Sequence, residues 1–238
     1  MTLLLTADLR KRAGSFAFWG LLLTILQSFL EQDLKDYHVS GVEYTELDTR
    51  FMIGDCILTE RLVLRPFEDG DAKDVLALMS DDYICKKAGI RPFKTLDEAK
   101  VFMANWAYEA YAMTERGCDK VIGIIQMPYI WGTYTVGIGY WLAGEYCGRG
   151  YMTEAIEAVK EMLFDENWWV DQLLLYVYVG NEASRNVALK CGFRPKYEAY
   201  KESVYNPYGT VESEECFTIT RGDYEWEQRG EDCYSTAA

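Results

Sequence analysis

The sequence has little of what histidine- or metal-dependent catalysis needs. Among its 238 residues there is one histidine, His38, which lies outside the region of the predicted active site. Mechanisms built on a Ser-His, Cys-His or His-metal unit are therefore disfavoured. The 7 cysteines are widely spaced and form no C-x-x-C pair, so neither a zinc site nor a disulfide framework is indicated. We predict no metal, and a reducing compartment fits the free thiols best.

Basic residues are also scarce. The chain carries 24 Lys and Arg against 38 Asp and Glu, which gives a formal net charge of −14 and a pI of about 4.6. Such a surface repels a phosphate backbone and disfavours nucleic-acid binding. It suits cationic partners such as amines or basic peptides, although an acidic surface is more often simply a solvated one. Hydrophobic residues make up 50% of the chain, enough for one good-sized core.

Hydrophobic periodicity predicts an α+β domain. A first strand is predicted at Thr59–Arg65, followed by two helices, one in "EDGDAKDVLALMSDD" and one from Thr95 to about Tyr111. Further strands are predicted at Val121–Met127, Thr133–Leu142, Leu173–Val179, Lys196–Tyr205 and Glu214–Thr220, with helices at Tyr151–Phe164 and within Asn181–Phe193. Because a helix connects the Thr133–Leu142 and Leu173–Val179 strands, we expect these two strands to be parallel within a mixed sheet.

The stretch "EYCGRGYMTEAI" places Gly148 and Gly150 between a predicted strand and a predicted helix. A helix N-terminus exposes backbone N–H groups and the positive end of a dipole, and glycines leave room for an approaching oxyanion. Arg149 adds a positive charge and Thr153 a hydroxyl. By itself such a turn is more often a tight connection, and both the full dinucleotide fingerprint and the P-loop are absent.

Several sequence blocks carry a family resemblance: "TERLVLRPF" from Thr59, "IGYWL" from Ile138, "GRGYMTEA" from Gly148, "NEASRNVALKCGF" from Asn181, and a closing strand that leads to "DYEW". Through them the sequence resembles the GCN5-related N-acetyltransferase (GNAT) superfamily, in its ribosomal-protein-alanine acetyltransferase-like branch, over roughly residues 57–226. The resemblance implies a mostly antiparallel twisted sheet with a central parallel strand pair flanked by helices. It also implies a cytoplasmic enzyme that transfers the acetyl group of acetyl-CoA by direct attack of a primary amine.

The resemblance assigns the cofactor-binding residues. The diphosphate of acetyl-CoA is expected on the backbone of the turn and the first helical residues: Arg149, Gly150, Tyr151, Met152 and Thr153. Cys147 stands where the superfamily has Gln or Arg, but backbone amides can bind a phosphate whatever the side chain. Trp141, Leu142, Asn181, Ser184 and Lys190 complete the expected set. For Asn181, capping of the following helix is the competing role.

The catalytic assignments follow from the same resemblance. The Leu142 N–H is the expected oxyanion donor, and Ser184 is the expected proton donor to the departing thiolate. Many branch members have a glutamate just before the "IGYWL" block, where this chain has Gly137. Glu202 is a replacement candidate for the base, the hydroxyls of Tyr200 and Tyr205 lie near it in sequence, and bound water is the remaining alternative.

The sequence leaves alternatives open for the acceptor, the oligomeric state and the catalytic activity itself. The acceptor is either the N-terminal amine of a protein or a small amine, and the enzyme is expected as a monomer or homodimer. The missing glutamate at position 137 keeps open a catalytically silent member of the fold that binds coenzyme A and acts as a sensor.

The first 51 residues differ from the rest of the chain. Basic residues at positions 10–12 precede an uncharged run over residues 13–30, which is compatible with a membrane anchor, a signal peptide, a surface-lying amphipathic helix or a superfluous extension. An anchor with its basic flank inside would separate the catalytic domain from cytosolic acetyl-CoA, so the last two are favoured. We therefore divide the chain into an extension (1–51), an acetyltransferase domain (52–229) and a tail (230–238).

This division predicts that residues 1–51 are dispensable. A chain that begins at Met52 keeps every block that carries the resemblance, so its melting temperature and its affinity for acetyl-CoA should match those of the full chain. Differential scanning calorimetry and isothermal titration of both lengths are the measurements. Aggregation of the shorter chain would instead show that the apolar run covers part of the core.

Overall fold

The computed structural model describes residues 56–130, 133–196, 201–205 and 211–229, and for residues 201–205 and 211–212 it describes the backbone only. The predicted extension, Tyr200 and the predicted tail lie outside these residues. Within them, no helix is long and apolar enough to cross a membrane.

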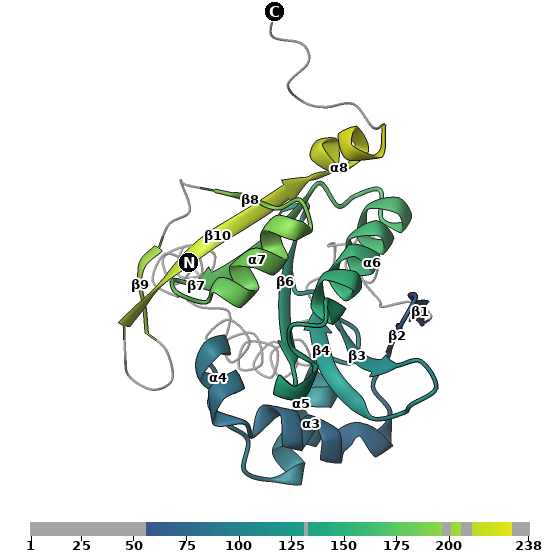
Figure 1. The fold of residues 1–238 in the computed structure, drawn as a ribbon, viewed down its shortest axis with the longest axis vertical. Helices are drawn as coiled ribbons and strands as arrows, with labels where there is room; N and C mark the ends of the chain where they lie inside the picture. Colours follow the sequence, from purple (N-terminus) through teal and green to yellow (C-terminus); the bar gives the residue numbers. More distant parts are fainter. Residues whose placement is uncertain (1–55, 131–132, 197–200, 206–210, 230–238) are drawn as a thin grey trace, which may run out of the picture.

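The centre of the fold is a twisted mixed sheet (Figure 1). Along its main path the strands are β1 (Ile57–Leu58), β2 (Leu62–Arg65), β3 (Ala110–Glu115), β4 (Val121–Gln126), β6 (Thr135–Leu142), β7 (Gln172–Tyr178), β10 (Val211–Thr220) and β8 (Arg194–Pro195). β5 (Tyr129–Ile130) pairs with β6, and β9 (Lys201–Tyr205) pairs with β10. Only β6 and β7 pair in parallel among the described strands, which confirms the predicted fold class and its central parallel pair.

Helices cover both faces of the sheet. They are α3 (Ala72–Met79), α4 (Asp82–Ala88), α5 (Leu96–Asn105), α6 (Tyr151–Glu166), α7 (Glu182–Lys190) and α8 (Arg221–Gln228). Figure 1 shows α3, α4 and α5 gathered apart from α6 and α7. Alternate residues of β6 serve the two sides: Ile138 packs in the apolar cluster with α6, and Trp141 packs in the cluster with α3 and α5. The sheet therefore has a separate apolar cluster on each face.

The predicted helix from Thr95 to about Tyr111 is wrong at its end. α5 stops at Asn105, and Tyr111 is a fully buried residue of β3. Every residue of β3 except Glu115 is buried, so the strand lacks the polar alternation by which a half-exposed strand is identified. α4 and α8 were not predicted. α4 begins after the Asp81 cap and ends at Gly89, whose φ is +64°.

The entry into α3 is fixed by a buried ion pair. Arg65 of β2 donates from Nη1 to Asp71 Oδ2 (2.7 Å) and from Nη2 to Oδ1 (2.8 Å), and both residues are less than a tenth exposed. The hydrogen bond to Asp71 raises the pKa of Arg65 above its ordinary value. Asp71 also accepts the backbone N–H of Glu68, so one carboxylate holds the strand and the turn before α3 together.

We predict that Asp71→Ala lowers the free energy of unfolding by about 3–5 kcal/mol, because it leaves a buried guanidinium without its partner. Urea denaturation is the measurement. Glu145→Ala is the control, since the Glu145–Lys120 pair (3.2 Å) is exposed to solvent and should contribute little to stability. Equal effects of the two substitutions would contradict this account.

Candidate active site

The candidate site begins where β6 and β7 part. Their parallel register ends at the pair Ile138–Leu175, although both strands continue for several residues. On its other edge β6 is antiparallel to β4, and the Ala143 N–H donates to the Ile122 carbonyl (2.9 Å). Because antiparallel bonding alternates, Trp141 and Gly139 bond to β4, whereas the N–H groups of Tyr140 and Leu142 are directed toward the β7 side. β6 therefore presents an open strand edge at the divergence.

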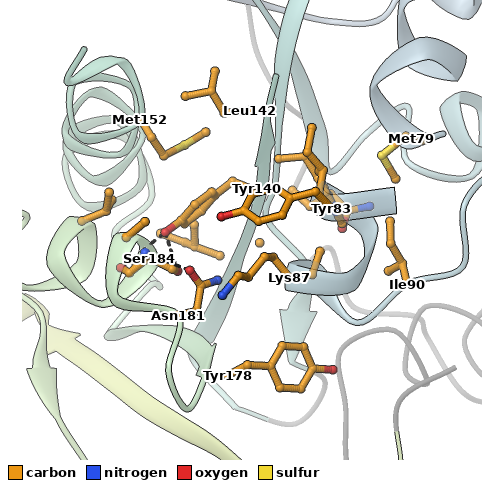
Figure 2. A pocket seen from close by; sticks show the side chains of 18 of the residues that line it. Met79, Tyr83, Lys87, Ile90, Tyr140, Leu142, Met152, Tyr178, Asn181 and Ser184 are labelled. Carbon is orange, nitrogen blue, oxygen red and sulfur yellow. Dashed lines mark hydrogen bonds between the residues drawn. The ribbon is translucent and has the colours of Figure 1, made fainter. Parts of the chain in front are cut away.

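A cavity of about 1470 Å³ opens at this divergence. Ligand pockets for drug-sized molecules are about 300–1,000 Å³, so there is room for two reactants. Figure 2 shows Tyr140 in the middle, with Met152 and Ser184 on one side and Tyr83, Met79 and Ile90 on the other. The cavity is thus lined from both faces of the sheet.

The predicted phosphate cradle lies at the start of α6. Gly148 and Gly150 have left-handed φ values of +74° and +81°, which an L side chain rarely adopts. A Cβ at Gly148 would meet no atom of the described residues within 4 Å, so no described side chain covers the turn at this position. Gly150 is the N-cap of the 16-residue helix, and no side chain caps it. The first-turn N–H groups of α6 are therefore available to an anion.

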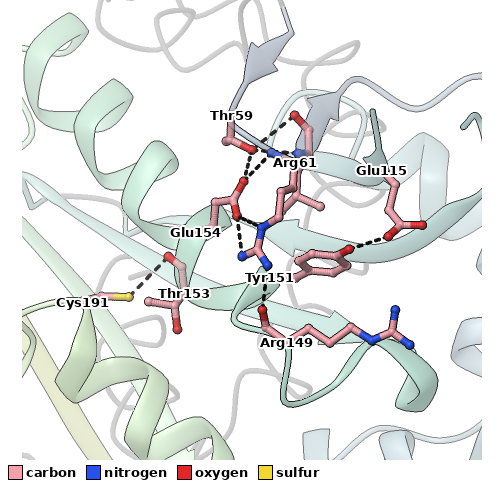
Figure 3. Close-up of polar contacts among 9 residues, drawn as sticks. Thr59, Arg61, Glu115, Arg149, Tyr151, Thr153, Glu154 and Cys191 are labelled. Atoms are coloured by element: carbon pink, nitrogen blue, oxygen red, sulfur yellow. Dashed lines mark hydrogen bonds and ion pairs between the residues drawn. The ribbon is translucent and has the colours of Figure 1, made fainter. Parts of the chain in front are cut away.

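A polar cluster holds this turn against the β1–β2 hairpin (Figure 3). Glu154 of α6 accepts from Thr59 Oγ1 (2.6 Å), Arg61 N (2.8 Å) and Arg61 Nε (2.6 Å). Arg61 Nη1 also donates to the Arg149 carbonyl (2.9 Å). Burial opposes ionisation of Glu154, but the hydrogen bonds from Thr59 and Arg61 outweigh it and lower its pKa. Arg61 and Glu154 are thus positioning residues for the turn.

Two of the predicted cradle residues direct their side chains elsewhere. The Arg149 guanidinium lies over the Tyr146 ring, 5.3 Å from its centroid. Arg149 is not among the described residues that line the cavity. The Tyr151 hydroxyl donates to Glu115 (2.5 Å). These two residues can therefore serve a phosphate through the backbone. Gly150, Tyr151, Met152 and Thr153 line the cavity, so Arg149 is the one predicted cradle residue that does not.

Ser184 and Tyr140 form a hydroxyl pair inside the cavity. Their oxygens are 2.6 Å apart, and either can be the donor. Burial raises the pKa of Tyr140 far above its ordinary value, so its hydroxyl keeps its proton at neutral pH. Asn181 lines the cavity and also accepts from the Ser184 N–H (3.5 Å), so it caps α7. Tyr140 belongs to the "IGYWL" block, but it was not among the predicted site residues.

The remaining predicted site residues differ in where they lie. Leu142 and Lys190 line the cavity. Trp141 also lines it, but its ring packs edge-on against Phe102 of α5 (6.0 Å), so its side chain is on the face opposite α6. Glu202 and Tyr205 belong to β9, where only the backbone is described.

The cysteine beside the turn is not activated. Desolvation raises the pKa of the Cys147 thiol, and its Sγ contacts the carbonyls of Ala143 (3.7 Å) and Leu142 (3.9 Å). A raised pKa leaves little of the nucleophilic thiolate. Within the described residues, no group of His, Cys, Asp and Glu is placed to hold a metal ion.

The face opposite α6 forms the second half of the cavity. Gly139 and Gln126 are register partners there, and a Cβ at Gly139 would lie 3.7 Å from Gln126 Oε1. Tyr178 of β7 packs against the Gly89 turn at the end of α4, and Glu214 of β10 lines the cavity while only 5% exposed. Sequence reasoning missed Gln126, Tyr178 and Glu214, and the last two become neighbours only through the pairing of β7 with β10, which are far apart in the sequence.

Comparisons with known proteins agree with this architecture. A family model described as an acetyltransferase (GNAT) domain matches residues 61–194, more than half of the chain. The uncharacterized N-acetyltransferase YoaA of Bacillus subtilis (strain 168) is 26% identical over 158 residues, 63% of this chain and 85% of the relative. A GNAT-family acetyltransferase from Bacillus anthracis has a TM-score of 0.64 and 24% identity, covering 70% of this chain and 99% of that one. Spermidine N-acetyltransferase from Vibrio cholerae, solved with CoA and spermine, has a TM-score of 0.60 and 18% identity, covering 69% and 98%.

Proposed function

Because the chain belongs to the GNAT acetyltransferase family, we propose that it transfers the acetyl group of acetyl-CoA directly to a primary amine. One observation carries the proposal: a single cavity reaches from the α6 turn, through the divergence of β6 and β7, to the α4 face. Direct transfer requires both substrates to be held in contact, and a cavity open on both faces of the sheet allows this.

In the proposed complex the diphosphate of acetyl-CoA lies on the N–H groups at the start of α6, within the positive end of the helix dipole. The pantetheine arm runs along the open edge of β6 and bonds to the backbone of Tyr140 and Leu142. Asn181 borders the same path from the start of α7. Lys190, at the end of α7, is the nearby cation on this face.

The proposed reaction has three requirements. The acceptor must lose a proton, which passes to bound water, so that its nitrogen lone pair can attack the thioester carbon. The Leu142 N–H stabilises the oxyanion that forms. As the C–S bond breaks, the Ser184–Tyr140 pair gives the thiolate a proton. The second amine proton returns to the Ser184–Tyr140 pair, so the products are an N-acetylated amine, free coenzyme A and the one proton that passed to water.

The finer assignments are also part of the proposal. The "IGYWL" and "GRGYMTEA" blocks favour the ribosomal-protein-alanine acetyltransferase-like branch, and the acceptor is either a protein N-terminus or a small amine. We propose that residues 52–229 form the catalytic domain, that the chain works as a monomer or homodimer, and that it acts in the cytoplasm, where acetyl-CoA is supplied.

The direct test is release of free thiol from acetyl-CoA in the presence of primary amines and short peptides with free N-termini. Labelled acetyl-CoA incubated with a cell extract then identifies the acceptor through its label. Transfer to an amine is the expected result. Tight binding of acetyl-CoA without transfer to any extract component would favour the silent sensor, consistent with Gly137 in place of a glutamate.

The cradle predicts a specific loss of affinity. Gly150→Glu places a negative charge and extra volume beside the diphosphate, so acetyl-CoA should bind more than about tenfold more weakly than to Gly150→Ala. Gly150→Ala is the matched control, because both variants put an L side chain at a φ of +81° and only one adds charge. Calorimetry measures both. Equal affinity of Gly150→Glu and the parent chain would place the diphosphate elsewhere.

The hydroxyl pair predicts a loss of turnover without a loss of binding. Ser184→Ala should lower turnover roughly 10- to 1,000-fold, the scale of one acid–base contribution, with nearly unchanged acetyl-CoA affinity. Tyr140→Phe tests whether the partner hydroxyl supplies the proton instead. Mass spectrometry after mixing Ser184→Cys with acetyl-CoA alone should show no acetylated enzyme. A stable acetyl adduct at that position would point to a two-step mechanism.

A further inference from the structure

Within the described part of the chain, Gln126 combines deep burial with a side chain that has no hydrogen-bond partner. It is the last residue of β4, it is only 6% exposed, and it lines the cavity. Its backbone pairs with Ala110 of β3 and Gly139 of β6, but no described residue bonds to its carboxamide. A buried polar side chain normally has a partner. Gln126 therefore has hydrogen-bonding capacity that a ligand can satisfy.

Gln126 lies beside the point where β6 and β7 part. Its register partner Gly139 directly follows Ile138, at which the parallel pairing ends. A Cβ at Gly139 would lie 3.7 Å from Gln126 Oε1, so the amide end of the side chain reaches toward this glycine. Neighbouring strands are about 4.8 Å apart. Gln126 is thus about one strand spacing from the place where the two substrates are proposed to meet.

The side chain of Gln126 is on the face opposite the phosphate cradle. Its neighbours Ile125 and Met127 pack in the apolar cluster with α6, whereas Ile124 packs in the cluster with α3 and α5. Alternation along a strand puts Gln126 on the same face as Ile124. This is the half of the cavity that the proposed position of acetyl-CoA leaves for the acceptor.

Aromatic side chains adjoin Gln126 on this face. Trp141 lies one alternate position beyond Gly139 and packs edge-on against Phe102 (6.0 Å). Its indole Nε1 is buried and also has no hydrogen-bond partner among the described residues. Apolar surroundings strengthen a hydrogen bond but penalise a charge that has no counter-charge. A neutral hydrogen-bonding group therefore fits beside Gln126.

The group that matches a carboxamide best is another amide. Gln126 offers N–H donors and a carbonyl acceptor, and an amide offers the same pair in reverse, so two hydrogen bonds can form together. In an α-amino amide, the kind of amine found at a peptide N-terminus, the amide carbon is two bonds from the attacking nitrogen. That short span suits a side chain one strand away from the divergence. A protonated polyamine has no acceptor to offer.

We propose that Gln126 binds the amide group next to the acceptor amine through paired hydrogen bonds, which makes the enzyme selective for α-amino amides. This inference rests on the proposed function and narrows the acceptor to amines with an amide on the neighbouring carbon. A carboxamide is neutral and takes up no proton near neutral pH, so the role of Gln126 is recognition and not acid–base catalysis.

The test measures binding, so it does not depend on turnover. Protein saturated with coenzyme A is titrated calorimetrically with alaninamide, with tetra-alanine and with isopropylamine, which has a methyl group where alaninamide has its amide. The parent should bind alaninamide at least about fivefold more tightly than isopropylamine. Gln126→Met keeps the side-chain length and removes the amide. It should weaken binding of both amides roughly 5- to 100-fold, the loss expected for two neutral hydrogen bonds, and leave isopropylamine and coenzyme A binding unchanged.

Gln172→Met is the matched control. It makes the same change in β7, but Gln172 Nε2 donates to Thr218 Oγ1 (2.8 Å), and Gln172 is not among the described residues that line the cavity. Equal losses in both variants, an equal loss for isopropylamine, or no binding of either amide by the parent would overturn the proposal. If Gln126→Met does not fold, the parent decides, because equal affinity for alaninamide and isopropylamine also overturns it.

The two amides distinguish the possible sources of the acceptor. Much tighter binding of tetra-alanine than of alaninamide, lost in Gln126→Met, would identify a peptide N-terminus, and equal binding would identify a small α-amino amide. A parent that binds amides through Gln126 but releases no thiol would contradict only the proposed transfer. Thiol release with amines that lack an amide, without amide binding, would contradict only the role of Gln126.

Discussion

β6 and β7 separate after Ile138 and Leu175, and the rest of the site depends on that separation. A strand with antiparallel bonds on one edge can leave its other edge open only where the neighbouring strand moves away. The open edge then carries backbone donors and acceptors that a ligand can use in place of a strand. Because β6 and β7 are parallel, the helix that connects them begins just beyond the end of β6. The same topology therefore supplies both the strand edge and the α6 N-terminus.

The two faces of the sheet divide the chemistry. On the α6 face, Tyr140 reaches Ser184 of α7, and the turn at Gly150 is held by Arg61 and Glu154. On the α4 face, glycines in β6 leave space, and the walls come from Trp141, Tyr178 and Glu214. The period of two in β6 puts Tyr140 and Trp141 on opposite faces although they are adjacent in sequence. The divergence joins the two sides, so two substrates can enter from different faces and meet.

Much of this arrangement could be predicted from the sequence, for identifiable reasons. The strand–turn–helix around Gly150 is local, and its glycines and apolar periods are visible in a short window. The parallel pair follows from the crossover connection alone. The helix predicted to reach Tyr111 was wrong because β3 is buried on both faces and shows no alternation. The place of Glu214 in the cavity wall could not be predicted, because only the register of β10 against β7 brings it beside Tyr178.

The central claim is that acetyl-CoA occupies the open edge of β6 between the two faces. Amide-resolved hydrogen exchange of the protein with and without acetyl-CoA tests this most directly, since a backbone N–H that binds the pantetheine arm or the acetyl carbonyl exchanges more slowly. We expect new protection at Tyr140, Leu142 and the first residues of α6, with little change at Trp141, which already bonds to β4. Protection confined to other parts of the chain, with Tyr140 and Leu142 unchanged, would contradict the account.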